Sequence, residues 1–197
     1  MLARHAFRND LVSKRTLARA LAEESRFRLG RSSKRRLDEV AEWALRLSAG
    51  TDMSEVADIT NAVADQIIDT VRPALRQLLD NHRHAGHETI VLSASPQPLV
   101  ELVAKGLNAD AGIGTRVEIV DGKLTGEMIP PFCYGAAKID RLQDVLGSIA
   151  TDTILYAYAD SASDLPLLEI AEHRIVVTPD KTLRGIAESR GWSILDF

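Results

Sequence analysis

The strongest constraint on the fold is the stretch Ile154–Leu168, where an apolar, aromatic-rich run gives way to two aspartates. A run of about six apolar residues bounded by turn-forming residues predicts a buried parallel strand with Asp160 at its tip. Asp164 follows in the first turn of the next helix. Both carboxylates can then converge and bind a hard cation such as Mg²⁺ through oxygen. The alternative, that the aspartates only cap a helix, is the preferred interpretation of this stretch alone.

The composition indicates a globular chain with a buried core. Its 197 residues, 45% hydrophobic and 26% charged, suffice for one elaborated domain or two small ones. The single cysteine, Cys133, excludes an internal disulfide framework, and no apolar run approaches the roughly 20 residues of a membrane span. The opening residues lack the apolar block of a secretory signal. We therefore expect a soluble, cytoplasmic protein without a membrane span.

Positive charge is concentrated at the start of the chain. Residues 1–36 hold eleven Lys or Arg against three acidic residues, although the net charge of the whole chain is −4. Such a segment could attract an anionic substrate, nucleic acid or acidic lipid. Most of these charges alternate with apolar residues at helical spacing, so the wet face of amphipathic helices is the preferred interpretation. Nucleic acid is accordingly not an expected partner.

The hydrophobic pattern changes near residues 84–88 and divides the chain into two expected domains. Residues 1–85 have apolar residues at helical spacing, with helices starting at Ser54 and at Pro73, and residues 86–197 alternate between strand and helix patterns. This alternation predicts an α/β fold with a mainly parallel sheet. Besides the strand that ends at Asp160, we expect strands at 89–92, 175–177 and 193–195, and a hairpin within 115–128 around Asp121-Gly122.

Two further positions carry chemistry at predicted strand and helix ends. Ser93 ends its strand just before a helix that is expected to open at Ser95. Its hydroxyl and the amides of Ala94 and Ser95 can therefore face an anion at a positive helix terminus. Lys138 begins the helix before the aspartate-tipped strand, where a lysine can neutralise a phosphoryl oxygen. Taken singly, each is more often a commonplace strand-end serine or surface lysine.

In this order the motifs resemble those of the haloacid dehalogenase (HAD) superfamily, and most closely its subfamily IB, the phosphoserine-phosphatase-like hydrolases. The matching segments are Leu-Ser-Ala-Ser-Pro-Gln-Pro-Leu at 92–99, Gly-Ala-Ala-Lys at 135–138, Tyr-Ala-Asp-Ser-Ala-Ser-Asp-Leu-Pro-Leu-Leu-Glu at 158–169, and the C-terminal tail from Val177. The resemblance covers nearly the whole chain. It implies a HAD-like Rossmannoid three-layer core with an all-helical cap, which the first domain looks like.

The resemblance also implies a reaction, phosphoryl transfer through an aspartyl-phosphate, with Mg²⁺ shielding charge and a small phosphorylated metabolite as substrate. Carried over by position, Ser93 would hydrogen-bond the phosphate and Lys138 would balance its charge and that of the nucleophile. Asp160 would bind Mg²⁺. Asp164 would support the metal site or Lys138 from behind the direct ligands.

The family's first motif, Asp-x-Asp-x-Thr, is missing. This motif supplies the nucleophile and the general acid/base, but the 197 residues contain no Asp-x-Asp pair, and Met1–Phe7 contains no carboxylate. In the family the first strand lies between the strands that here end at Ser93 and Asp160. Its absence would leave two strand edges facing each other with unpaired backbone donors and acceptors. We therefore expect negligible hydrolysis of phosphate esters by this chain.

Two explanations account for the missing strand. Either the product begins upstream of Met1, or the chain is a degenerate member whose sheet closes by rearrangement or by pairing with another chain, including a second copy of itself. The first is preferred because the other three motifs keep their chemistry. The function hypotheses are a Mg²⁺-dependent phosphomonoester hydrolase seen without its nucleophile strand, a non-catalytic phosphate- and metal-binding remnant or regulatory protein, and an interaction module that uses the basic helical segment.

A few other residues have a chemical and a structural interpretation. The histidines His82, His84 and His87 could form a metal site, but histidines at a helix C-terminus are also favoured by its dipole, which is the preferred interpretation. Cys133 could be a nucleophile, yet no neighbouring residue supplies an activating base. Tyr134 could line the pocket, although packing is the preferred role.

Overall fold

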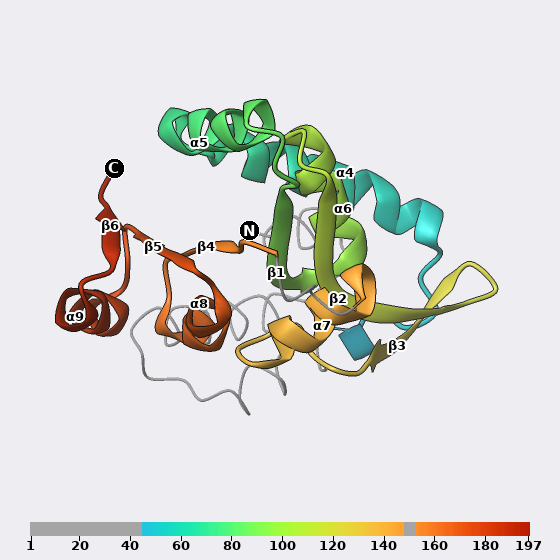
Figure 1. Cartoon of the computed structure of the whole chain (residues 1–197). Coiled ribbons are helices and arrows are strands. Elements are labelled where there is room, and N and C mark those ends of the chain that lie inside the picture. The colour runs from blue at the N-terminus through green and yellow to red at the C-terminus, as the bar shows by residue number, and fades with distance from the viewer. Residues whose placement is uncertain (1–44, 148–152) are drawn as a thin grey trace.

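Helices and strands alternate from residue 90 to the end of the chain, as predicted (Figure 1). The computed structural model describes residues 45–147 and 153–197, so the basic segment and the helices expected before residue 45 lie outside the described residues. Within the described ranges, no helix combines the length and apolarity that a membrane crossing requires. The elements are α4 (Met53–Thr70), α5 (Pro73–His84), β1 (Ile90–Pro96), α6 (Gln97–Gly106), β2 (Ala111–Val120), β3 (Lys123–Ile129), α7 (Ala137–Leu146), β4 (Tyr156–Ala159), the 3₁₀ turn η1 (Ala162–Asp164), α8 (Leu165–Ile170), β5 (His173–Val177), α9 (Lys181–Arg190) and β6 (Ser193–Leu195).

Local capping sets where the first two described helices begin. The Asp52 carboxylate accepts a hydrogen bond from the backbone N–H of Ser54 at 2.9 Å, so α4 starts at Met53, one residue before the expected Ser54. α5 begins at Pro73 as predicted, because proline at the first helical position loses no hydrogen bond.

The strands that the structure describes form two separate three-stranded sheets, ordered β1-β2-β3 and β4-β5-β6. Among the described strands, β2 and β3 pair antiparallel and all other pairs are parallel, which confirms the mainly parallel α/β fold. The predicted hairpin is also confirmed. Its turn residues Asp121 and Gly122 have φ of 50° and 76°, which Asp-Gly adopts readily.

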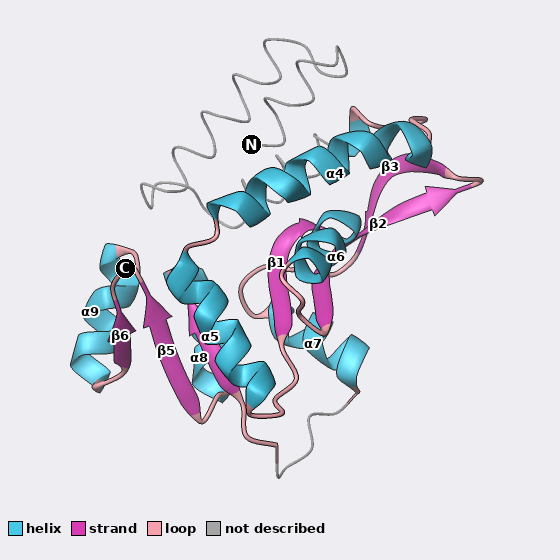
Figure 2. Ribbon diagram, turned by 90° about the horizontal axis from the view of Figure 1, so that it is seen from above, coloured by secondary structure: helices cyan, strands magenta, loops and turns pink. Residues whose placement is uncertain are grey.

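No hydrogen-bonded pairing joins β1 to β4 in the described part of the chain. Seen from above, α5 lies over the space between β1 and the second sheet (Figure 2). The two sheets nevertheless share one core, since Ile90 and Leu92 of β1 pack against a cluster that contains Ala157 and Ala159 of β4. The break falls at the position that the resemblance assigns to the absent first strand.

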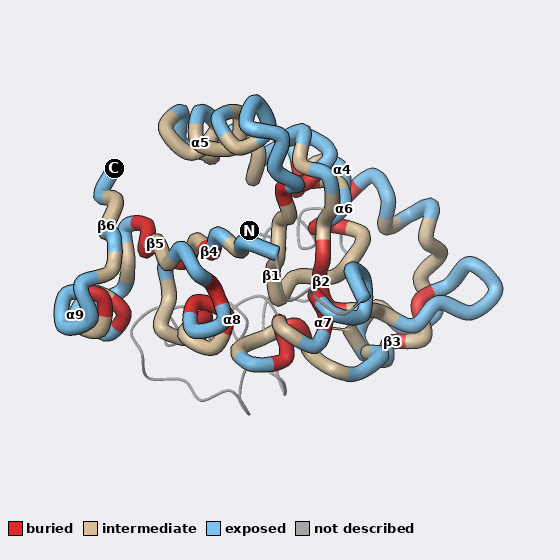
Figure 3. Tube along the Cα trace, in the orientation of Figure 1, coloured by how far each residue is buried: buried red, intermediate tan, exposed pale blue. Residues whose placement is uncertain are grey.

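Burial is uneven across this break (Figure 3). The apolar run at 89–92 favours a buried strand, but each of the seven residues of β1 is only partly buried, so that expectation is wrong. Within the described residues, one edge of β1 has no hydrogen-bonded strand beside it, which leaves that side less covered. β4 is buried on one face, where Ala157 and Ala159 are 4% and 6% exposed, whereas Tyr156 on the other face is 37% exposed.

The contact of α6 with β2 and α4 is closely packed. A methyl group added to Gly112 of β2 would approach the carbonyl oxygen of Val100 in α6 to 2.6 Å, so glycine permits the close approach of helix and strand. On its other side α6 packs Leu99 and Val103 against Ile59 and Val63 of α4. α4 thereby anchors the helical segment on the α/β part of the chain.

Candidate functional site

Ser93 lies in β1 and faces the beginning of α6. The sequence predicts that a helix opens at Ser95, but β1 continues through Pro96 and α6 begins at Gln97. Ala94 and Ser95 are therefore strand residues. The N–H of Ser95 donates to the Ser93 Oγ at 3.2 Å, which leaves the Ser93 hydroxyl proton available to an incoming anion.

Lys138 and Asp164 form a buried ion pair. Lys138 lies in the first turn of α7 and Asp164 ends η1, and their Nζ and Oδ1 atoms are 2.7 Å apart. The two side chains are 10% and 12% exposed. Asp164 therefore contacts Lys138, one of the two roles that the resemblance left open for it.

Asp160 follows β4 and is exposed. Its backbone carbonyl accepts a hydrogen bond from the N–H of Asp180 at 2.8 Å, while its carboxylate has no hydrogen bond or ion pair with any described residue. Such a carboxylate suits a hard cation such as Mg²⁺, which binds one or two carboxylates together with water and phosphate oxygens. Asp160 offers one of these ligands.

Further metal ligands do not gather around Asp160 in the described part of the chain. The described residues contain no group of three or more His, Cys, Asp or Glu side chains placed to hold a metal ion. His82, His84 and His87 are among the described residues and form no such group. The residues present thus fit part of a Mg²⁺ site, and a complete site requires further oxygen ligands.

The capping interpretation of the two aspartates is wrong. The N–H of Ser163 donates to the Ser161 hydroxyl at 3.3 Å, and Asp164 makes no capping bond at the start of α8. Asp180, farther along the chain, accepts from the N–H groups of Ala162 and Leu183 at 2.9 and 2.8 Å. A serine and a distant aspartate therefore satisfy the amides, which leaves Asp160 and Asp164 to other contacts.

Cys133 is buried in the loop that leads to Lys138. It is 0% exposed, and burial raises the pKa of its thiol, so the thiolate that a nucleophile requires is disfavoured. Its N–H donates to Thr115 Oγ1 at 3.2 Å. The neighbouring Tyr134 stacks on Phe132 with ring centroids 6.1 Å apart, which agrees with a packing role.

Sequence patterns did not single out a buried polar group beside this loop. Arg141 is 3% exposed, and it donates from Nε to the carbonyl of Gly114 at 3.2 Å and from Nη1 to Asp144 Oδ2 at 3.0 Å. Gln97 Oε1 accepts from the N–H of Gly114 at 2.6 Å. The available signal was the position of Arg141 one helical turn after Lys138, on the inward face of α7.

A histidine and a tyrosine connect α5 to β4 across the break in the sheet. His82 Nε2 lies 2.7 Å from the Tyr158 hydroxyl, and His82 Nδ1 lies 2.8 Å from His87 Nδ1. Burial, with a smaller contribution from His87, lowers the pKa of His82. His82 therefore joins the end of α5, which precedes the first sheet, to β4 of the second sheet.

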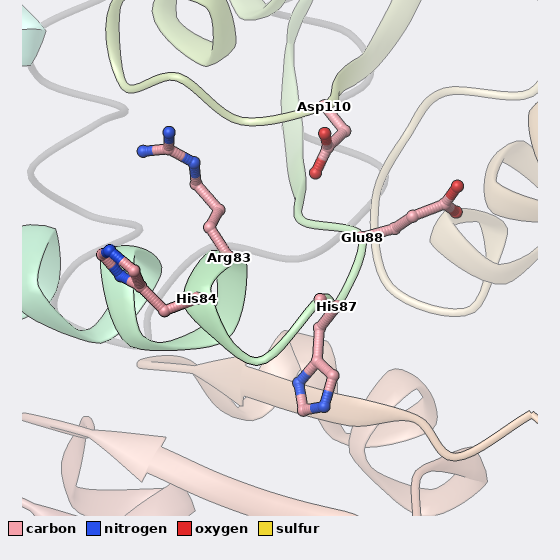
Figure 4. A pocket seen from close by; sticks show the side chains of 6 residues that line it. Arg83, His84, His87, Glu88 and Asp110 are labelled. Atoms are coloured by element: carbon pink, nitrogen blue, oxygen red, sulfur yellow. The ribbon is translucent and has the colours of Figure 1, made fainter.

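A surface cavity of about 390 Å³ lies at the amino ends of β1 and β2, away from Ser93 (Figure 4). Its carboxylate Asp110 accepts hydrogen bonds from the N–H and hydroxyl of Thr89, which lower the Asp110 pKa. Two of the candidate metal-binding histidines, His84 and His87, line the cavity, but the proposed phosphate- and Mg²⁺-binding residues do not, so we assign it no part in that chemistry. The lining residues are Arg83, His84, Gly86, His87, Glu88 and Asp110.

Comparison with known proteins extends these observations. Residues 1–169 match the family described as haloacid dehalogenase-like hydrolase. A probable phosphatase of Mycobacterium tuberculosis is 32% identical over 193 residues, which cover 97% of this chain and 67% of that protein. A phosphoserine phosphatase of the same species is 30% identical over 158 residues, which cover 78% of this chain and 51% of that protein. The crystal structure of a protein of unknown function from Bordetella pertussis Tohama I has the same fold, with a TM-score of 0.84 and 24% identity over 98% of this chain and 89% of that chain.

Proposed function

The chain belongs to the haloacid dehalogenase-like hydrolase family, and on this basis we propose that it serves the hydrolysis of small phosphomonoesters through an aspartyl-phosphate, with Mg²⁺. The buried Lys138–Asp164 pair carries this proposal. A buried ion pair adds little stability, because desolvation of both charges offsets their attraction. A buried lysine held in this way is better explained by an anionic ligand, which we propose to lie between Lys138, Ser93 and Asp160.

Hydrogen-bond capacity supports a phosphate-binding role for Ser93 and Lys138. An ammonium group has three N–H donors, and Asp164 takes one of those on Lys138. The remaining donors can bind a phosphoryl oxygen and the attacking carboxylate. The Ser93 hydroxyl accepts from the N–H of Ser95 and can donate its own proton to the phosphate. The amides of Ala94 and Ser95 are the further phosphate donors that we propose.

Asp160 is the residue that we propose to bind Mg²⁺, which would draw charge from the phosphoryl group when bound. Asp164 acts indirectly in this proposal, because it fixes the position and the charge of Lys138. The remaining carboxylates, including the nucleophile, belong to the Asp-x-Asp-x-Thr motif, which these 197 residues do not contain. We therefore propose that these residues by themselves hydrolyse phosphate esters negligibly.

Within the described residues, β1 and β4 each have one edge without a hydrogen-bonded strand, which gives the missing strand a place to pair. β1 pairs parallel with β2 and β4 pairs parallel with β5, and α5 lies over the space between the two edges. A strand parallel to both would satisfy their backbone groups and bring its carboxyl end to the edge where Ser93 and Asp160 lie.

A paired assay tests the function. The chain and a version with an Asp-x-Asp-x-Thr strand joined ahead of Met1 by a flexible linker are incubated with Mg²⁺ and p-nitrophenyl phosphate. We expect turnover by the joined version alone, and a loss of about a hundredfold or more when Lys138 is replaced by methionine in it.

Two controls separate the outcomes of this assay. Replacing the first aspartate of the joined motif by asparagine should abolish turnover, because this removes the nucleophile. Turnover by the unmodified 197 residues would contradict the proposed inactivity. A joined version that folds, gains protection of β1 amides from hydrogen exchange and still stays inert would contradict the proposed phosphatase chemistry.

A second candidate function is non-catalytic binding of a phosphorylated ligand and a cation. It is favoured by the same groups, since Ser93, Lys138 and Asp160 keep their donors and acceptors without a nucleophile. Calorimetric titration of the chain with inorganic phosphate and Mg²⁺ tests it, with Lys138→Met as the control variant. Saturable binding that the variant loses, together with an inert joined version, would favour this candidate.

Substrate identity is open to a direct screen. The phosphoserine phosphatase among the relatives makes phosphoserine the first small metabolite to test on the joined version. Interaction through the basic segment within residues 1–36 stays a prediction, since that segment lies outside the described residues. Cytoplasmic location and association with a second copy also stay predictions.

A further inference from the structure

The Thr115 side chain lies between two segments that lead to the proposed phosphate-binding groups, namely the end of β1 and the loop before α7. Thr115 is 2% exposed and pairs with Pro96 in the β1–β2 register. Its hydroxyl donates to the carbonyl of Ala94 at 2.8 Å and accepts from the N–H of Cys133 at 3.2 Å. One buried hydroxyl thus connects the residue after Ser93 to the loop before Lys138.

The surroundings of Thr115 are too closely packed to absorb a change in this contact. A methyl group added to the neighbouring Gly114 would meet the carbonyl oxygen of Ser95 at 2.6 Å and the Cα of Gln97 at 3.0 Å. β2 and the segment after Ser93 therefore touch backbone to backbone. A shift at Ala94 is transmitted because closely packed interiors have little free space to take it up.

The loop before α7 is fixed at its other end as well. Lys138 is held by Asp164 at 2.7 Å, and a methyl group added to Gly135 would lie 3.6 Å from the carbonyl oxygen of Ser163. Two neighbouring residues of β2 hydrogen-bond this loop: Thr115 accepts from the N–H of Cys133, and Arg116 donates from Nη2 to the carbonyl of Pro130 at 2.7 Å.

We propose that Thr115 is a positioning residue, which sets the separation of Ser93 from Lys138 through its bonds to Ala94 and Cys133. This inference rests on the proposed function, in which both groups bind one phosphate. Small displacements of such groups weaken binding strongly, because the contacts must be made together.

Three variants of the full chain test the proposal by amide hydrogen exchange. Thr115→Val removes the hydroxyl and keeps the shape, and Thr115→Ser keeps the hydroxyl. Thr60→Val is the matched control, because Thr60 is 8% exposed and donates to a backbone carbonyl inside α4, remote from these segments. If Thr115→Val does not fold, Thr115→Ala replaces it.

We expect Thr115→Val to raise the exchange rate of the Cys133 and Ser95 amides about tenfold relative to the core amides of β5. Loss of one buried hydrogen-bond partner favours local opening by about this factor. Thr115→Ser and Thr60→Val should leave this ratio unchanged. A uniform rise across the chain, an equal rise in Thr115→Ser, or no rise at all would overturn the positioning role.

Phosphate titration separates this inference from the proposed function. In the joined version, Thr115→Val should weaken inorganic phosphate binding about tenfold, and Thr115→Ser should restore it. If exchange changes as expected but the unmodified protein binds no phosphate, the positioning of the two segments stands and the proposed phosphate site fails. If Thr115→Val and Thr115→Ser both bind phosphate as tightly as the unmodified joined version, the inference fails and the proposed function stands.

Discussion

β1 and β2 are adjacent parallel strands of similar apolar character, yet their burial differs. β2 contains Ile113 at 0% exposure and Thr115 at 2%, whereas no residue of β1 is fully buried. The helices show the same contrast, since α6 has four buried residues and α5 has none. The buried positions of β2 lie within residues 111–115, which pair with β1 and lie against α6, whereas residues 116–120 pair with β3 and none of them is buried. Neighbours rather than apolar sequence therefore decide how much of each element is buried.

The largest expected effect compares truncations in the two strands. Ile113→Ala in β2 should lower the free energy of unfolding by about 3 kcal/mol, because it creates a cavity in a fully buried position. Leu92→Ala in β1 should cost about 1 kcal/mol, because its side chain is already partly in water. Urea denaturation followed by circular dichroism measures both. Equal losses would show that β1 is as well covered as β2.

A smaller effect is expected from the close approach of β2 and α6. Gly112→Ala should lower the free energy of unfolding by about 2 kcal/mol, because its methyl group would meet backbone atoms of Val100 and Glu101 at 2.6–2.8 Å. Gly185→Ala in α9 is the control, since no heavy atom lies within 4 Å of the added carbon. It should stabilise by about 0.5–1 kcal/mol through helix propensity. Stabilisation by both changes would contradict tight packing at α6.

The smallest expected effect is a pH dependence of the α5 contact with β4. The pKa of His82 is lowered from 6.5 in the folded state, so the unfolded chain takes up this proton first as the pH falls. Stability from the His82–Tyr158 contact is therefore present above about pH 6.5 and declines on acidification. Thermal unfolding at pH 7.5 and 5.5 should show a smaller decline in His82→Gln than in the unmodified chain. His84→Gln, whose ring contacts the carbonyl of Asp80, should decline like the unmodified chain.

Features that are set by residues adjacent in the sequence could be predicted from the sequence. The turn at Asp121-Gly122, the start of α5 at Pro73 and the last strand at Ser193–Leu195 follow from local propensity. The boundary between β1 and α6 could not be predicted in this way. Pro96 stays in the strand because it pairs with Thr115 of β2, and no local pattern encodes that contact.

The residues of the candidate site could likewise be predicted only where a motif in the sequence marks them. The family motifs predicted Ser93, Lys138, Asp160 and Asp164, and the structure brings Lys138 and Asp164 into direct contact. The supporting residues Thr115 and Arg141 were missed, because a threonine in a strand and an arginine in a helix are ordinary in sequence. Their importance comes from burial and from hydrogen bonds to backbone carbonyls, which depend on the tertiary fold.

The split sheet has a consequence for how the chain folds. β1 and β2 are joined by the single helix α6, and α8 and α9 join β4, β5 and β6 in turn, so each half is built from pairings between segments close in sequence. Closing these short connections costs less chain entropy than bringing the two halves together. Each half should therefore form early and by itself. The slow event should be their docking through α7 and Asp164, and a strand placed between β1 and β4 would convert two quickly formed pieces into one cooperative unit.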